Sequence, residues 1–163
     1  NGKEDTAFTV QYDFCMPEKF NLTYVDEHNQ EQRAFVVHRS SIGAIERVMA
    51  FLIEYYAGAF PLWLAPVQVT VLPISDQHHQ HAEQVLTELK KQNIRVELNL
   101  DNATLGKKIR QAKEQKVPYL VIIGDQEVAS GQLTIEGRHE KLENVSVDAF
   151  IARLQTEISL RSL

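Results

Sequence analysis

The sequence predicts an α/β fold in two parts. After residue 61, short apolar segments typical of strands alternate with amphipathic segments typical of helices. This order gives an open sheet with helices packed on it. Before residue 61, extended segments precede a single amphipathic helix. Between the parts, Pro61 and Pro66 frame an apolar run through which a helix cannot continue. We therefore predict a domain boundary near Pro61, with residues 1–60 in one domain and residues 61–163 in the other.

The composition indicates a soluble globular protein. Hydrophobic residues make up 44% and charged residues 24% of the 163 residues, which is the range of folded domains. The most apolar run, residues 51–66, contains Glu54 and Pro61 and is shorter than the ~20 residues that cross a bilayer. No leader of basic and then apolar residues opens the chain at Asn1. The one cysteine, Cys15, cannot form an internal disulfide. We therefore expect a cytoplasmic protein without membrane contact, in which Cys15 packs among apolar neighbours.

The distribution of charge is more informative than its sum. The net charge of −5 argues against avid, indiscriminate binding of nucleic acid. Residues 1–60 hold 5 Lys and Arg against 9 Asp and Glu, whereas residues 61–163 hold 12 against 13. Within the second part, residues 105–116 carry several cations and one acid, Glu114. Any contact with RNA should therefore be local and selective.

In the first part, three extended segments precede the helix. They are a strand at residues 6–14, a solvated hairpin at residues 21–33, and a buried strand at residues 34–37. Apolar residues then recur on one face of a helix at residues 45–56. At about 100° per residue, Arg47 lies about 200° from Ile45 and points away from that face. An arginine in this position can bind a phosphate, although an ordinary surface arginine would show the same pattern.

The second part reads as alternating strands and helices. The predicted strands are residues 67–74, 95–99, 119–124 and 132–136, and the predicted helices are residues 76–92, 105–116 and 147–160. Ser75 or Asp76 is the expected N-cap of the first helix, and Ser146 precedes the last. The apolar faces of these two helices are Ala82, Val85, Leu86 and Leu89, and Val147, Phe150, Ile151, Leu154 and Ile158.

Three histidines, His78, His79 and His81, fall at the start of the helix predicted at residues 76–92. Two of them are three residues apart, a spacing that can place two metal ligands on one helix face. No carboxylate or cysteine of clear spacing accompanies them. We therefore expect a solvated first turn and no metal site there.

One motif indicates a function. The pattern His38-Arg39-x-x-x-Gly43-x-x-Glu46-Arg47 resembles the third signature motif of class II aminoacyl-tRNA synthetases. A His directly before the first Arg is typical of the threonyl-tRNA synthetase family. Further matches follow in the same order over nearly the whole chain, at residues 9–14, 16–20, 58–69, 105–110, 118–119 and 124–127. The resemblance implies that residues 1–60 are the end of the antiparallel class II catalytic domain. It implies that residues 61–163 are an anticodon-binding domain, with a mixed five-stranded sheet and three helices.

The resemblance also implies an activity and its partners. The family activates threonine with ATP and Mg to threonyl-adenylate, and then transfers the threonyl group to tRNA(Thr). The enzyme is expected to be a homodimer. The 163 residues alone are expected to be inactive, because the strands that carry the first two signature motifs are missing.

The resemblance assigns roles to seven positions of this sequence. It implies that Arg47 contacts the ATP phosphates, with bidentate geometry suited to a guanidinium. Gln11 matches a position that contacts the adenylate and the tRNA end, and Thr9 matches a polar position beside the adenylate. His38 matches the last of three zinc ligands, of which the other two, a Cys and a His, would precede Asn1. The anticodon is expected to be contacted by Asn102, Arg110 and Glu127.

Two departures from the family pattern leave other functions open. Residues 5–8 are Asp-Thr-Ala-Phe, where many family members carry Trp-Gln-Cys-Gly. Glu136 stands where family members commonly carry an arginine that contacts the middle anticodon base, and Arg138, on the same strand face, is a candidate substitute. One alternative is a synthetase paralogue or accessory module that binds tRNA without aminoacylation. Another is an α/β domain that binds a small molecule.

Overall fold

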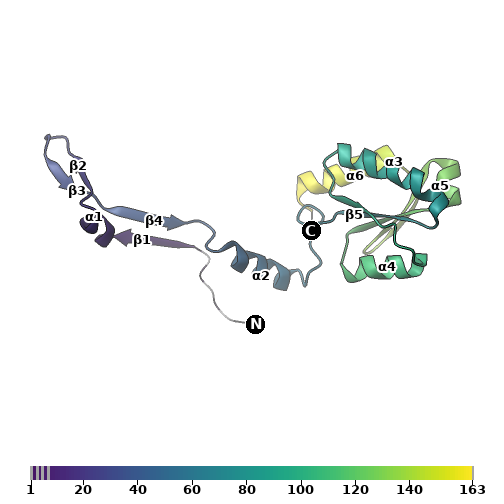
Figure 1. Cartoon of the computed structure of the whole chain (residues 1–163), viewed down its shortest axis with the longest axis horizontal. Coiled ribbons are helices and arrows are strands. Elements are labelled where there is room, and N and C mark those ends of the chain that lie inside the picture. The colour runs from purple at the N-terminus through teal and green to yellow at the C-terminus, as the bar shows by residue number, and fades with distance from the viewer. Residues whose placement is uncertain (1, 3, 5, 7, 163) are drawn as a thin grey trace. The chain divides into compact units, whose positions relative to one another are not determined.

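The computed structural model describes residues 2, 4, 6 and 8–162 (Figure 1). Residues 5 and 7 of the first family departure therefore lie outside the described residues. The chain forms two compact units, Asn1–Glu54 and Tyr55–Leu163. Within the described part of the chain, every helix is too short or too polar to cross a membrane.

The first unit contains two antiparallel strand pairs. β1 (Thr9–Asp13) pairs with β4 (Val36–Ser40), and β2 (Thr23–Val25) pairs with β3 (Glu31–Arg33). α1 (Cys15–Lys19) follows β1, and α2 (Ile45–Tyr55) follows β4. The predicted first strand, hairpin and helix are thus confirmed, whereas α1 was not predicted. In the hairpin turn, the Asp26 carboxylate accepts hydrogen bonds of 2.9 Å from the backbone N–H groups of His28 and Gln30.

Apolar side chains of the first unit are largely exposed. Tyr12, Phe35 and Ile45 are 70%, 67% and 69% exposed. The prediction of a buried strand at residues 34–37 is therefore wrong, because β4 begins at Val36 and Phe35 faces solvent. The predicted packing of Cys15 is also wrong, since its side chain is exposed. The physical reason is that a two-stranded pair needs a second layer to bury either face.

The second unit is built on a mixed five-stranded sheet of order β6-β5-β7-β8-β9. The three parallel strands are β5 (Val69–Pro73), β6 (Val96–Leu98) and β7 (Tyr119–Ile123), and the two antiparallel strands are β8 (Gln132–Gly137) and β9 (Lys141–Ser146). The helical segments are η1 (Asp76–His78), α3 (His79–Lys91), α4 (Leu105–Glu114), α5 (Asp125–Ser130) and α6 (Val147–Leu160). This confirms the predicted α/β class and the mixed five-stranded sheet.

The two faces of the sheet are covered unequally. α3 and α6 lie on one face and α4 on the other (Figure 1). The larger apolar core contains Val71, Val121, Ile135, Leu89 and Phe150 together with their neighbours under α3 and α6. The smaller one, under α4, consists of Leu72, Ala112, Val117 and Leu120, and it includes no residue of β8 or β9. The predicted apolar faces of α3 and α6 are confirmed, because every residue named for them is buried or packed against the larger core.

The proline-framed connector is held by side chains of the second unit. Gln68, which is 1% exposed, donates from Nε2 to the Leu62 carbonyl at 2.9 Å. Arg95 donates to the carbonyls of Ala65 and Trp63 at 2.8 and 2.9 Å. Backbone carbonyls that a turn leaves without partners are thereby satisfied. The run framed by Pro61 and Pro66 is part of this unit.

Candidate nucleic-acid interface

One polar face of the sheet in the second unit is left open beside α4. On β8, Leu133 and Ile135 point into the larger core, so Thr134 and Glu136 point to the opposite face. A hollow of about 460 Å³ on that side is lined by parts of α5, β8 and β9. A second hollow of about 260 Å³ lies between α4 and β8. We call these two hollows together the α4–β8 groove; Glu127 and Thr134 line the larger one, and Lys113 and Glu136 line the smaller one.

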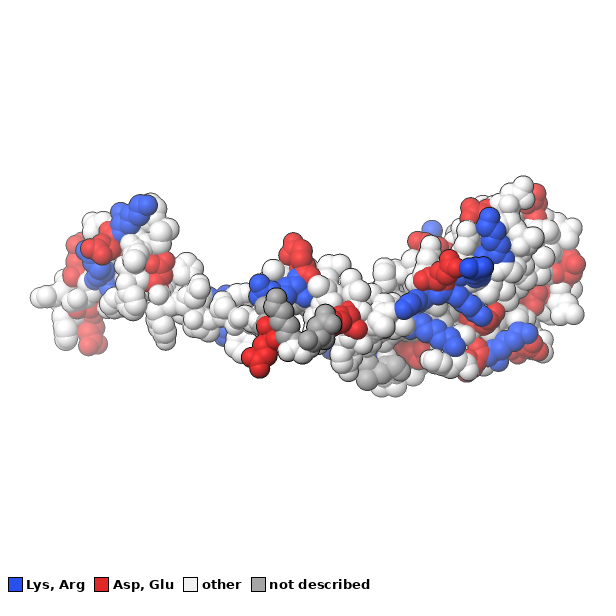
Figure 2. Space-filling view, turned by 90° about the horizontal axis from the view of Figure 1, so that it is seen from below, with Lys and Arg blue, Asp and Glu red and all other residues white. Residues whose placement is uncertain are grey.

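α4 is a basic helix, of which Lys113 lines the smaller hollow. It contains Lys107, Lys108, Arg110 and Lys113. Seen from below, from the side of α4, Lys and Arg side chains gather on the second unit (Figure 2). Lys108 does not contribute to this surface, because it is 3% exposed and its ammonium donates to the Pro73 carbonyl at 3.0 Å. Arg110 is exposed and pairs with Glu114 at 2.9 Å, so it is accessible to a ligand.

Of the three residues predicted to face the anticodon, Glu127 lines the larger hollow, whereas Asn102 and Arg110 line neither. Asn102 is exposed in the loop between β6 and α4, and Glu127 lies in the first turn of α5 after β7. Because β6 and β7 are both parallel to β5, the loops that follow them emerge at the same edge of the sheet. Arg110 lies three residues before Lys113, on the same side of α4.

Glu127 is a fixed, ionised hydrogen-bond acceptor. It is 9% exposed and accepts from Thr134 Oγ1 at 2.6 Å and from the Gly124 N–H at 2.9 Å. Burial acts to raise the pKa of Glu127, but the hydrogen bonds from Thr134 and Gly124 outweigh it and leave the pKa lowered. Each carboxylate oxygen has a second lone pair, so Glu127 can still accept from a ligand in the adjoining hollow.

Glu136 and Arg138 are both engaged within the fold. The Glu136 carboxylate pairs with the Lys113 ammonium across the groove. Arg138 donates to the carbonyls of Ala59 and Phe60 at 3.1 and 2.7 Å, and also to the Lys116 carbonyl. Burial lowers the pKa of Arg138. Its guanidinium therefore bonds three backbone carbonyls and keeps further N–H donors. The role of Arg138 as a substitute for the arginine that family members commonly carry at position 136 stays a prediction.

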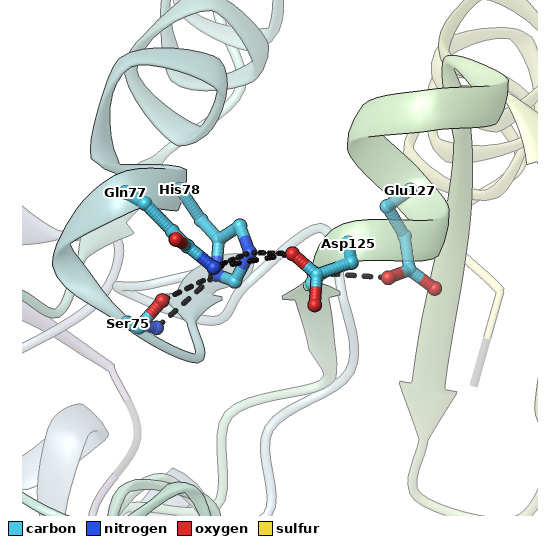
Figure 3. A network of polar contacts seen from close by, with 6 residues as sticks. Ser75, Gln77, His78, Asp125 and Glu127 are labelled. Atoms are coloured by element: carbon cyan, nitrogen blue, oxygen red, sulfur yellow. Dashed lines mark hydrogen bonds and ion pairs between the residues drawn. The ribbon is translucent and has the colours of Figure 1, made fainter.

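A buried histidine lies at the same edge of the sheet as Glu127. The prediction of a solvated turn is wrong for His78, which is 3% exposed and hydrogen-bonds to Ser75 and Asp125 (Figure 3). The missed signal is its spacing, because His78 lies four residues before Ala82 and seven before Val85 on the buried face of the helix.

In the first unit, β1 and β4 bring two predicted site residues together. Gln11 is directly opposite His38 in the strand register, and both line one shallow hollow. Thr9 is opposite Ser40, two residues from Gln11 and on the same strand face. Asp13 joins this set, although sequence reasoning did not identify it. Its Oδ2 lies 3.0 Å from His38 Nε2. Hydrogen bonds from the Met16 N–H and from His38 lower the pKa of Asp13.

Arg47 lies in the first turn of α2, where its Nη1 donates to the Thr6 carbonyl at 2.9 Å. The turn before α2 is stabilised by Ser40, whose hydroxyl accepts from the Gly43 N–H at 2.8 Å. Gly43 has a φ of +74°, a conformation that a residue with a side chain rarely adopts. The motif thus forms a strand, a tight turn and a helix.

Among the described residues, no group of three or more His, Cys, Asp or Glu could hold a metal ion. His38 is therefore a single candidate ligand. Its contact with the Asp13 carboxylate is the kind that orients a metal-ligating imidazole, and it leaves Nδ1 as the nitrogen for a metal.

Comparisons with known proteins agree with this geometry. Residues 68–157 match the family described as anticodon binding domain. Threonine--tRNA ligase of Thermotoga neapolitana is 47% identical over 163 residues, covering 99% of this chain and 26% of the relative. The same enzyme of Clostridium botulinum (strain Eklund 17B / Type B) is 44% identical over 162 residues, covering 99% of this chain and 25% of the relative. The chain thus spans about a quarter of the length of these curated relatives.

A solved structure is similar to this chain as well. The RNA binding domain of threonyl-tRNA synthetase from Cryptosporidium parvum Iowa II superposes with a TM-score of 0.73 at 30% sequence identity, covering 94% of this chain and 39% of that one. Since the family match covers more than half of the chain, the chain belongs to the anticodon-binding domain family, in the form found in threonyl-tRNA synthetases.

Proposed function

We propose that this chain is part of a threonine–tRNA ligase, and that its second unit binds the anticodon of tRNA(Thr) in the α4–β8 groove. The observation that carries the proposal is the family match over residues 68–157. The open polar face of β8 beside the basic helix α4 supports it, because single-stranded RNA requires a positively charged groove with accessible polar groups.

In this proposal, Glu127 in the groove and Asn102 in the loop before α4 read base edges, and Arg110 on α4 contacts the RNA backbone. An ionised carboxylate repels phosphate and accepts from the N–H groups of a base, as Glu and Asp do with cytosine N4. The lowered pKa of Glu127 supports this role, since the group stays an acceptor at neutral pH.

The first part of the chain, residues 1–60, is proposed to be the end of the antiparallel catalytic domain. The exposed apolar residues of β1, β4 and α2 support this assignment. A two-stranded pair is marginal in water, so a larger sheet is needed to cover these faces. The relatives, about four times longer than this chain, have room for one.

In that domain, Arg47 binds the phosphates of ATP with Mg, and Gln11 and Thr9 contact the adenylate. A guanidinium has the planar donors that suit a phosphate and stays charged throughout the reaction. Together these residues support threonine activation followed by transfer to tRNA(Thr), in a homodimeric, cytoplasmic parent enzyme.

Zinc is proposed as a cofactor of the longer enzyme, with His38 as one ligand. When bound, it would hold the amino and hydroxyl groups of threonine. The contribution of this chain is the imidazole of His38, oriented by Asp13.

Three assays test the proposal. The 163-residue chain should bind a tRNA(Thr) transcript more tightly than a transcript with an altered anticodon, and Arg110→Ala should weaken both. It should show no threonine-dependent exchange of pyrophosphate into ATP. Exchange by the isolated chain would contradict its proposed inactivity. Failure of tRNA to protect the surface at residues 102–116 from chemical modification would favour a small-molecule-binding domain.

A second candidate function is a tRNA-binding module without aminoacylation. The Lys113–Glu136 pair favours it, because it places a carboxylate where family members commonly carry an arginine. In the longer protein, pyrophosphate exchange that depends on Arg47 would exclude this alternative.

A further inference from the structure

His78 joins two loops at one edge of the sheet. β5 leads through Ser75 into η1 and α3, and β7 leads through Gly124 into α5. β5 and β7 are adjacent parallel strands, so the loops that follow them meet at their carboxyl ends. The His78 side chain, 4% exposed, lies between these loops and points toward Asp125 (Figure 3).

The neighbours of His78 determine its tautomer. The backbone N–H of Ser75 lies 3.2 Å from Nδ1, and because an N–H can only donate, Nδ1 is an acceptor. Nε2 therefore carries the proton and donates to Oδ1 of Asp125 at 3.0 Å. Gln77 Nε2 donates to the same oxygen at 3.1 Å. The imidazole is thus a neutral bridge that accepts from its own loop and donates to α5.

The hydrogen bond from His78 reaches the first residue of α5, a helix that is too short to be stable alone. α5 has six residues, and a helix of that length has little stability without tertiary contacts. Asp125 is its first residue, and its carboxylate accepts from His78 and Gln77. Together with the Glu127 carboxylate, which accepts from the Gly124 N–H, these bonds hold the start of α5. The two loops also approach closely, since a Cβ on Gly124 would lie 2.6 Å from Cδ1 of Ile74.

The other side of the same turn carries Glu127. Its carboxylate accepts from Thr134 and from the Gly124 N–H and borders the larger hollow of the α4–β8 groove. A change in the position of Asp125 shifts Glu127, because both lie in one helical turn. Hydrogen bonding to a base edge is sensitive to such a shift, since it requires well-aligned donors and acceptors.

We propose that His78 is a positioning residue for RNA recognition: its Nε2–H bond to Asp125 sets the first turn of α5 and so places the Glu127 carboxylate against the base that it reads. The inference rests on the proposed anticodon-binding function. His78 itself need not touch RNA.

A double-mutant cycle on the full chain tests the proposal. The measured quantity is the Kd for a tRNA(Thr) transcript, in the parent chain, His78→Ala, Glu127→Ala and the double variant. We expect His78→Ala to weaken binding about tenfold in the parent chain and not at all in the Glu127→Ala background. His78→Gln, whose amide can donate to Asp125, should bind within about twofold of the parent chain. His79→Ala is the matched control and should leave Kd unchanged.

The outcomes separate this inference from the proposed function. If Glu127→Ala binds tRNA as tightly as the parent chain, the anticodon role of Glu127 and this inference both fail. If Glu127→Ala weakens binding but His78→Ala has the same effect in both backgrounds, this inference alone is overturned. It is likewise overturned if His78→Ala leaves the Kd of the parent chain unchanged.

A second measurement needs no variant that could misfold. In a long-range ¹H–¹⁵N spectrum of the unmutated chain, His78 should show a protonated Nε2 and an unprotonated Nδ1 at neutral pH. The opposite tautomer, with Nδ1 protonated and Nε2 bare, would remove the bond to Asp125 and the proposal with it.

Discussion

Oδ2 of Asp13 lies 3.0 Å from Nε2 of His38, so a carboxylate at the end of β1 holds the ring of the proposed zinc ligand on β4. The same carboxylate accepts from the backbone N–H groups of Cys15 and Met16 at 3.0 and 2.9 Å. The imidazole is therefore held by a group that is itself fixed by the start of α1, which gives Asp13 a role beyond that of a surface charge.

Asp13→Asn should lower zinc affinity in the longer protein by about tenfold to hundredfold, as loss of an outer carboxylate partner typically does. The amide keeps an oxygen for the backbone bonds but loses the charge. Zinc content after dialysis against a chelator is the measurement. Asp26→Asn, which alters a similarly hydrogen-bonded carboxylate that contacts no histidine side chain, is the control. Unchanged zinc retention in Asp13→Asn would refute the role.

Arg47→Ala in the longer protein should reduce threonine-dependent pyrophosphate exchange about 10²- to 10³-fold, the range for a lost charge-stabilising donor. Arg47→Lys should recover only part of that loss, because an ammonium cannot contact phosphate bidentately. Arg33→Ala, an exposed arginine on β3, is the matched control. Full exchange activity in Arg47→Ala would refute the proposed contact of Arg47 with the ATP phosphates.

Glu136→Gln should strengthen binding of a tRNA(Thr) transcript about two- to fivefold, because the substitution releases Lys113 and removes a negative charge from the groove. The dependence of log K on log salt concentration should become steeper by about 0.7, as for one more phosphate contact. Glu88→Gln, in an ion pair on α3, should change neither value. Weaker binding in Glu136→Gln would instead indicate that Glu136 accepts a hydrogen bond from a base.

The stability of the second unit should fall at high pH because of Tyr119. Burial first, and then its hydrogen bond to Glu157, raise the pKa of Tyr119 from 10.0 to about 12. The folded state therefore holds this proton more tightly than the unfolded state. The stabilisation that comes from this proton of Tyr119 is present below pH 10 and is lost as the pH rises to about 12. In Tyr119→Phe, urea denaturation should show a smaller loss of stability between these values. An identical loss in both proteins would contradict the assignment.

Gln68→Leu should destabilise the second unit by about 1–3 kcal/mol, because it leaves the Leu62 carbonyl and the Arg95 N–H without their buried partner. Urea denaturation followed by the fluorescence of Trp63, the single tryptophan of the chain, measures this effect near the connector. Gln84→Leu, at an exposed position of α3, should have little effect. A neutral result at Gln68 would mean that water or a neighbouring group replaces the lost bonds.

Sequence patterns were sufficient where a segment's own periodicity decides its structure. α6 was predicted with the bounds that it has, because its apolar residues recur at helical spacing behind the N-cap Ser146, whose hydroxyl accepts from the Ala149 N–H. β9 was not predicted, because charged residues and an irregularity at Asn144, with a φ of +57°, interrupt its alternation. α5 was missed because six residues hold too little periodic signal.

The chain's residues alone also indicated the family, through a motif in which an imidazole, a glycine and a guanidinium follow one another at set intervals. They could not show that His78 is buried, that Arg138 is engaged by three backbone carbonyls, or that Lys113 pairs with Glu136. Each of those contacts joins segments far apart in the chain or depends on which helix face is covered. Such partners become neighbours only when the sheet and its helices pack, so the accessible charges of the groove followed from the packed structure and not from local pattern.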